Sequence, residues 1–171
     1  RHMELQSSLL CAAGLSAGFS FAQRGGMCRS TPVEAQTSSQ VMQCEALRKQ
    51  GDPGTTACYQ ALSRSKDLGL RAEGLYGLRD YRTANDAFRD AVKARPKDAN
   101  LKVRWGRLFV DYSQPGDAAD LFKEALEIDP NNAKALYGMA LVASDAFEGN
   151  AADFAEKALK ADPNLFEARE L

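Results

Sequence analysis

A repeat of 34 residues constrains this 171-residue chain more than any other feature. Prolines recur at Pro96, Pro130 and Pro163, which lie 34 and 33 residues apart. The segments that end at these prolines align in their small and apolar residues: DAFRDAVKARP, DLFKEALEIDP and DFAEKALKADP. A period of this length with helical spacing of the apolar residues indicates stacked helical hairpins. We therefore predict an all-α fold.

The residues in register resemble the signature of the tetratricopeptide repeat (TPR), a family whose members form α-α superhelices of helical hairpins. The middle repeat carries the signature at Gly106, Phe109, Ala118, Phe122, Ala125 and Pro130. The resemblance implies three hairpins, at residues 65–98, 99–132 and 133–165. Small residues let the two helices of a hairpin approach closely, and the aromatic residue fills the space before the next hairpin. We expect Phe88 and Phe122 to be buried, and Trp105 to be at least partly buried.

The chain on either side of these repeats is less regular. Residues 40–64 are expected to form a diverged hairpin that caps the array on its N-terminal side, with a turn at the Gly-Asp-Pro-Gly cluster of residues 51–54. Residues 166–171 are expected to begin a further, truncated helix, as in a fragment of a longer repeat protein. Asp117 and Asn150 precede apolar-periodic runs, so we expect them to cap the second helices of their hairpins.

The N-terminal segment has a different character. Arg1-His2-Met3 resembles the remnant of an expression tag, and residues 8–22 are uncharged, apolar and too short to span a bilayer comfortably. Residues 1–22 are therefore interpreted as signal-peptide-like, which favours a periplasmic or secreted bacterial protein; an ordinary helix here would favour the cytoplasm instead. We expect residues 5–22 to form a helix packed on protein. Residues 23–39 are polar and rich in Gly, Ser and Thr, and are expected to be a linker.

The four cysteines do not suggest a metal site, because none falls in a C-x-x-C pair and the only histidine is His2. Cys44 and Cys58 lie on opposite sides of the turn in the predicted N-terminal hairpin. Two hypotheses stay open for this pair: a disulfide that closes a short loop, or two buried free thiols.

Composition and motifs argue against several functions. The 22 Lys and Arg residues balance 23 Asp and Glu residues, so the basic excess of a nucleic-acid-binding protein is missing. The glycines at positions 69, 74 and 77 lack the lysine of a phosphate-binding loop, and close helix contact explains them better. We predict no catalytic residue, no cofactor and no metal, and hence no enzyme activity.

The family resemblance also implies a ligand-binding groove on the concave face, lined by the first helix of each repeat. Eight residues at inward-pointing positions are predicted to bind a peptide: Lys66, Tyr76, Val103, Arg107, Val110, Lys134, Tyr137 and Leu141. Glu73 and Asp111 occupy inward positions as well. Some members bind a terminal carboxylate with a set of Lys, Asn and Arg side chains, but here Gly69 and Glu73 stand where Lys and Asn are needed. The remaining surface suits a short peptide or amphipathic helix with an acidic flank.

The first functional hypothesis is a protein–protein interaction scaffold that binds a peptide or helix of a partner. The second is a non-catalytic regulatory or substrate-presenting arm of a larger envelope enzyme, such as a peptidase or glycosyl transferase. The third is a self-assembly module, in which the apolar N-terminal segment or uncapped ends of the solenoid would form a homo-oligomer.

Overall fold

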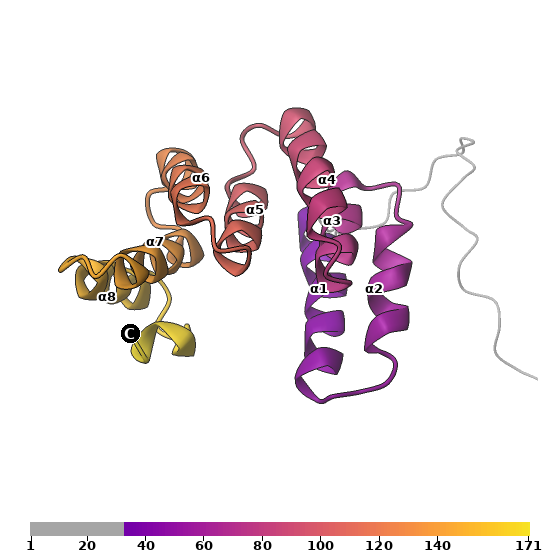
Figure 1. Ribbon diagram of the computed structural model, residues 1–171, viewed down its shortest axis with the longest axis horizontal. Helices are drawn as coiled ribbons and strands as arrows, with labels where there is room; N and C mark the ends of the chain where they lie inside the picture. The colour runs from indigo at the N-terminus through magenta and orange to yellow at the C-terminus, as the bar shows by residue number, and fades with distance from the viewer. Residues whose placement is uncertain (1–32) are drawn as a thin grey trace, which may run out of the picture. The chain divides into compact units, whose positions relative to one another are not determined.

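The computed structural model describes residues 33–171, and within this range the chain forms eight α-helices, one short 3₁₀ helix and no strand (Figure 1). The prediction of a packed helix at residues 5–22 lies outside the described residues. The all-α prediction is confirmed. The elements are α1 (Val33–Lys49), α2 (Thr55–Ser63), α3 (Leu68–Gly77), α4 (Tyr81–Ala94), α5 (Ala99–Asp111), α6 (Pro115–Ile128), α7 (Ala133–Asp145), α8 (Ala151–Ala161) and η1 (Phe166–Arg169).

Consecutive helices pair as hairpins, and each hairpin packs on the next. Helices α3 and α4, α5 and α6, and α7 and α8 are the most extensively packed pairs, and α6 in turn packs on α7. We call α3, α5 and α7, the first helices of the three hairpins, the inner helices, and α4, α6 and α8 the outer helices. Helix α5 also packs directly on α7. Within residues 33–171, no helix combines the length and the apolar character needed to cross a membrane.

Phe122 shows why the repeat needs its signature residues. Its ring is 2% exposed and lies between two glycines, Gly106 on α5 and Gly138 on α7. A Cβ atom on Gly106 would lie 2.7 Å from Phe122 Cε1, and one on Gly138 would also overlap the ring. Phe88 is fully buried in the first hairpin, as predicted, and Trp105 is half-buried with Nε1 donating to Asn85 Oδ1 at 2.8 Å.

The helix N-termini are capped by residues other than the two predicted. Asp67, Asp98 and Asn132 accept the backbone N–H three residues on, at the starts of the inner helices α3, α5 and α7. Asp117 does not cap α6, because Pro115 starts the helix two residues earlier and leaves Asp117 inside the first turn. Asn150 stands at the N-cap of α8, but its near-helical backbone (φ −97°, ψ 1°) gives no side-chain cap hydrogen bond.

Helix α1 corrects the predicted linker, because it starts at Val33, inside residues 23–39. The sequence has neither Gly nor Pro from Val33 to Gln50, so nothing in it interrupts a helix that docks on α2 and α3.

Cys44 on α1 and Cys58 on α2 form a disulfide with a Cα–Cα distance of 5.6 Å. Val41 and Tyr59 pack around it.

Two glycines of α3 allow α2 to pack closely, which confirms their interpretation as contact residues. A Cβ atom at Gly74 would overlap the backbone of Ser63, and one at Gly77 would overlap the ring of Tyr59.

At the other end of the array, η1 is a 3₁₀ turn rather than the start of an α-helix, with Ala168 N–H donating to Leu165 C=O. The buried Ala168 packs against Leu136 and Ala158.

Candidate functional site

Five of the eight predicted groove residues lie beyond the first turn of the inner helices and keep part of their side chains accessible. Tyr76 belongs to α3, and it is half-buried. Arg107 and Val110 belong to α5, where Arg107 is exposed and Val110 half-buried, and the half-buried Tyr137 and Leu141 belong to α7. Beyond their first turns, these helices therefore offer a surface with aromatic rings, the exposed cation Arg107 and partly accessible aliphatic side chains.

The other three residues are placed differently. Val103 is 6% exposed and packs with Ala99, Phe122 and Ala135, so it belongs to the core rather than to the groove. Lys66 precedes α3 and lies in the connection from α2, not on the inner helix. Lys134 is exposed in the first turn of α7.

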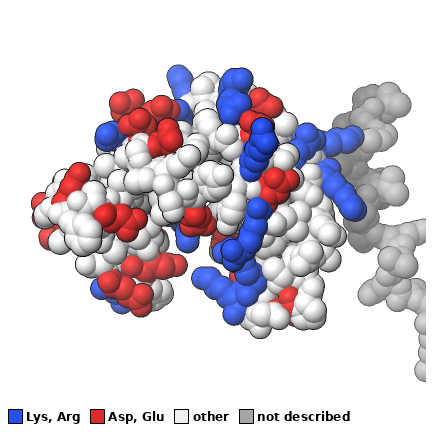
Figure 2. All heavy atoms as spheres, in the orientation of Figure 1, with Lys and Arg blue, Asp and Glu red and all other residues white. Residues whose placement is uncertain are grey.

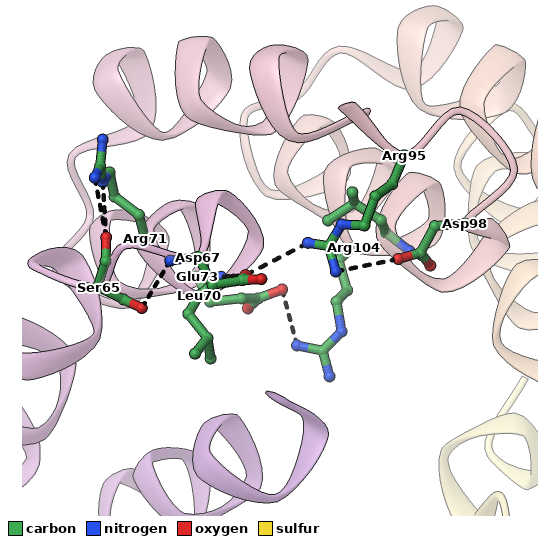
Figure 3. A network of polar contacts seen from close by, with 9 residues as sticks. Ser65, Asp67, Leu70, Arg71, Glu73, Arg95, Asp98 and Arg104 are labelled. Atoms are coloured by element: carbon green, nitrogen blue, oxygen red, sulfur yellow. Dashed lines mark hydrogen bonds and ion pairs between the residues drawn. The ribbon is translucent and has the colours of Figure 1, made fainter. Parts of the chain in front are cut away.

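A buried ion pair joins α3 to α5 in the inner layer. Figure 3 shows the side chains of Glu73 and Arg104 pointing toward one another, with Arg104 Nη1 2.8 Å from Glu73 Oε1. Glu73 is only 5% exposed, and no described donor makes a well-directed hydrogen bond to its Oε1. Burial raises the pKa of the Glu73 carboxyl, and the Arg104 cation opposes this shift only in part. The pair neutralises Arg104, so this arginine is not available to a ligand.

Arg95 ties together the starts of two inner helices (Figure 3). Its guanidinium lies 3.4 Å from Asp67 Oδ1 and 3.8 Å from Asp98 Oδ2. The same carboxylates accept the backbone N–H groups of Leu70 and Leu101. Arg95 therefore stabilises the stacking of repeats rather than offering a binding group.

Tyr76 links the groove surfaces of α3 and α5. Its hydroxyl donates to Asp111 Oδ2 at 2.5 Å, and its ring packs on Tyr81, which contacts Tyr112 in turn. Burial raises the pKa of the Tyr76 hydroxyl, and the hydrogen bond to the Asp111 carboxylate raises it further. Tyr76 therefore stays protonated at neutral pH and keeps its hydrogen bond to Asp111.

Arg107 is the one cation of α5 with no ion-pair partner among residues 39–171, because Lys102 pairs with Glu124 and Arg104 with Glu73. Burial raises the pKa of the Tyr137 hydroxyl, the Arg107 cation lowers it, and the Glu167 and Glu170 carboxylates raise it. Arg107 and the two glutamates therefore shift the pKa of the same tyrosine in opposite directions.

Charge divides unevenly along the described chain. Residues 33–111 contain 14 Lys and Arg and 10 Asp and Glu, whereas residues 112–171 contain 5 Lys and Arg and 12 Asp and Glu. Figure 2 shows the same division in space, with acidic atoms gathered over the C-terminal helices and basic atoms over the helices before them. The described chain therefore passes from a basic to an acidic character along the stack.

The sequence did not predict Arg104, Glu167 or Glu170 as parts of this surface. Arg104 stands three residues before Arg107, so helical spacing places it on the same side of α5 and was the available signal. Glu167 and Glu170 were hidden because they follow the last complete repeat. Within residues 33–171, no group of three His, Cys, Asp or Glu residues is arranged to hold a metal ion.

We predict that Glu73→Gln makes stability less dependent on pH. The pKa of Glu73 is raised in the folded state, so folding becomes less favourable as pH rises from the ordinary range of a glutamate through the raised value. Each unit of the shift corresponds to about 1.4 kcal/mol. The free energy of unfolding of the variant minus that of the parent chain should therefore increase with pH, as measured by urea denaturation at several pH values.

The same substitution at the exposed Glu127 controls for the loss of one carboxylate. The free energy of unfolding of Glu73→Gln minus that of the parent chain could instead stay constant or fall as pH rises. This result would contradict the assignment of burial as the dominant effect on the pKa of Glu73.

The fold defines a class: the described helices form the hairpin solenoid seen in tetratricopeptide-repeat proteins. No model of a protein family matches the chain. It is 30% identical over 74 residues to the RNA polymerase-associated protein CTR9 of Caenorhabditis elegans, a stretch that is 43% of this chain and 6% of that protein. The chain therefore spans only a small part of this curated relative.

Three solved structures show the same fold at low sequence identity. The first TPR of Spaghetti (RPAP3), bound to the HSP90 peptide SRMEEVD, has a TM-score of 0.56 and 19% identity over 60% of this chain and 82% of that chain. YrrB, described as a TPR protein with an unusual peptide-binding site, has a TM-score of 0.57 and 14% identity over 81% and 75%. MamA from Desulfovibrio magneticus RS-1 has a TM-score of 0.54 and 20% identity over 78% and 79%.

Proposed function

We propose that the chain is a protein–protein interaction scaffold that binds a peptide or helix of a partner protein against the inner helices α3, α5 and α7, without catalysing a reaction. The observation that carries this proposal is the exposed Arg107, which has no ion-pair partner among residues 39–171. It lies on α5 one turn before Asp111, which accepts the hydroxyl of the half-buried Tyr76, and α5 packs on α7, which carries the half-buried Tyr137. Packing does not use this guanidinium. A surface arginine beside aromatic rings is a common anchor for a partner.

The similar structures support the same role. One of them holds the HSP90 peptide SRMEEVD, and another is described by its peptide-binding site. The details differ here, because Gly69 has no side chain and the buried Glu73 carries a carboxyl, where a carboxylate-binding set needs the donor groups of Lys and Asn. Arg107 is the group that would contact an acidic side chain of the partner.

The disulfide supports a location outside the reducing cytosol. Disulfides persist in secreted proteins and in the periplasm, and are rare where glutathione and thioredoxin keep thiols reduced. Cys44 and Cys58 are bonded across the α1–α2 hairpin. We therefore propose that this scaffold functions in a periplasmic or extracellular compartment.

Arg107→Glu is expected to weaken binding of the natural partner at least about tenfold, since it reverses the charge of the anchor. Arg107 is exposed and makes no ion pair within residues 39–171, so stability should change by less than about 1 kcal/mol. The partner would be captured with the full chain, identified by mass spectrometry, and titrated by calorimetry.

Arg82→Glu is the matched control, because it makes the same charge change at an exposed position of the outer helix α4. Equal affinity of the parent chain and Arg107→Glu, with the helical circular dichroism intact, would refute binding at the inner helices.

A further inference from the structure

We propose, resting on the proposed function above, that the inner surface binds a peptide whose charges are separated, with an acidic side chain against Arg107 and a basic side chain against Glu167 and Glu170. Figure 2 shows a recess on the side of the inner helices, with basic atoms on one wall and acidic atoms on the other. In the same orientation, Figure 1 places α7 and η1 at one wall, α5 above the recess, and α1 and α3 at the other.

Above the recess, Arg107 is the cation of α5 that is available to a ligand. The other cations of α5 are neutralised, Lys102 by Glu124 and Arg104 by the buried Glu73. Asp111, one turn beyond Arg107, already accepts the Tyr76 hydroxyl at 2.5 Å. A guanidinium left with free donors beside aromatic surface can bind a carboxylate through two hydrogen bonds, so an acidic side chain is the ligand group of choice.

At the acidic side, Glu167 and Glu170 are exposed and make no ion pair among residues 39–171. Arg169 lies between them in sequence but is engaged within its own turn. Its Nη2 donates to Pro163 C=O at 2.8 Å, and its guanidinium lies 5.0 Å from the centre of the Phe166 ring. No cation of residues 39–171 pairs with these two side chains, so both can contact a basic group of a ligand.

Aromatic surface connects the two charged ends. Tyr137 on α7 is half-buried and packs against the cluster that contains Ala168 of η1, which stands between Glu167 and Glu170 in the sequence, and α7 also packs on α5. Tyr76 on α3 adjoins α5 as well, where its hydroxyl donates to Asp111. Apolar residues of a peptide that span the two charged contacts would pack on these rings. A peptide of uniform charge would be attracted at one end and repelled at the other, so charge separation becomes the basis of specificity.

A selection from a random peptide library displayed on phage, with the full chain as bait, tests this inference. Binders are titrated by fluorescence polarisation against the parent chain, Arg107→Glu, the double variant Glu167→Lys with Glu170→Lys, and the control Arg82→Glu. We expect binders with an acidic and a basic group separated by apolar residues. Each groove variant should weaken them at least about tenfold, and the control should not. Shuffling the charges of a selected peptide so that acidic and basic residues alternate should weaken it similarly.

Some selected peptides could lose affinity for Arg107→Glu yet bind the Glu167→Lys, Glu170→Lys double variant as tightly as the parent chain. That result would overturn the charge-separated ligand and leave the interaction scaffold in place. Peptides that bind equally to all four chains would overturn both, because their site would then lie away from the inner helices. Circular dichroism of each variant establishes that the helices are intact, so a loss of affinity reports the contact itself.

Discussion

Phe122→Ala is expected to lower the free energy of unfolding by about 3–5 kcal/mol, the largest effect of any single substitution proposed for this chain. The ring is 2% exposed and fills the space between Gly106 of its own hairpin and Gly138 of the next. Neither glycine has a side chain that could move into the vacated volume, so the substitution leaves a cavity at the junction of α5, α6 and α7. The measurement is urea denaturation followed by circular dichroism.

Phe147→Ala is the matched control for this experiment. Phe147 is 97% exposed in the connection between α7 and α8, so the same change in side chain removes almost no buried surface. Its effect should stay within about 0.5 kcal/mol. A loss of less than about 1 kcal/mol for Phe122→Ala would mean that the hairpins can close over the missing ring, against the packing described here.

Removal of the Cys44–Cys58 disulfide is expected to lower the free energy of unfolding by about 3 kcal/mol, because the bond closes a short loop and constrains the unfolded chain. The double variant Cys44→Ala with Cys58→Ala avoids a buried hydroxyl at the fully buried Cys44. The measurement is denaturation of the parent chain and of the variant, each with and without a phosphine reductant. The reductant should destabilise the parent chain and leave the variant unchanged.

The effect should also be local. Helix α1 contacts only α2 and α3 to a notable extent, whereas the hairpins from α3 to α8 pack on one another without it. Hydrogen exchange should therefore accelerate in α1 and α2 on reduction and stay slow in α5 to α8. Equal stability of the oxidised and reduced parent chain would show that packing of Val41 and Tyr59 alone holds α1.

The inner surface was only partly accessible to prediction. Tyr76, Arg107 and Tyr137 followed from their positions in the repeat, because an inward position on one hairpin recurs at the same offset in the next. The position in the repeat does not predict that Val103 is buried whereas Arg107 is exposed and makes no ion pair within residues 39–171. That distinction depends on which neighbour each side chain meets: Val103 meets the α6 and α7 core, whereas Arg107 has no carboxylate within ion-pair distance among residues 39–171.

The sequence by itself determined the all-α architecture, the hairpin repeat and the packing roles of Phe88 and Phe122. These features follow from small, apolar and proline residues that recur at a fixed period, and a single chain contains several copies of this pattern. Tertiary structure decided the start of α1 within a segment predicted to be a linker, the pairing of Glu73 with Arg104, and the packing of η1 near Tyr137. Each of these depends on contacts between helices of different hairpins, where the energy of one side chain is set by residues far away in sequence.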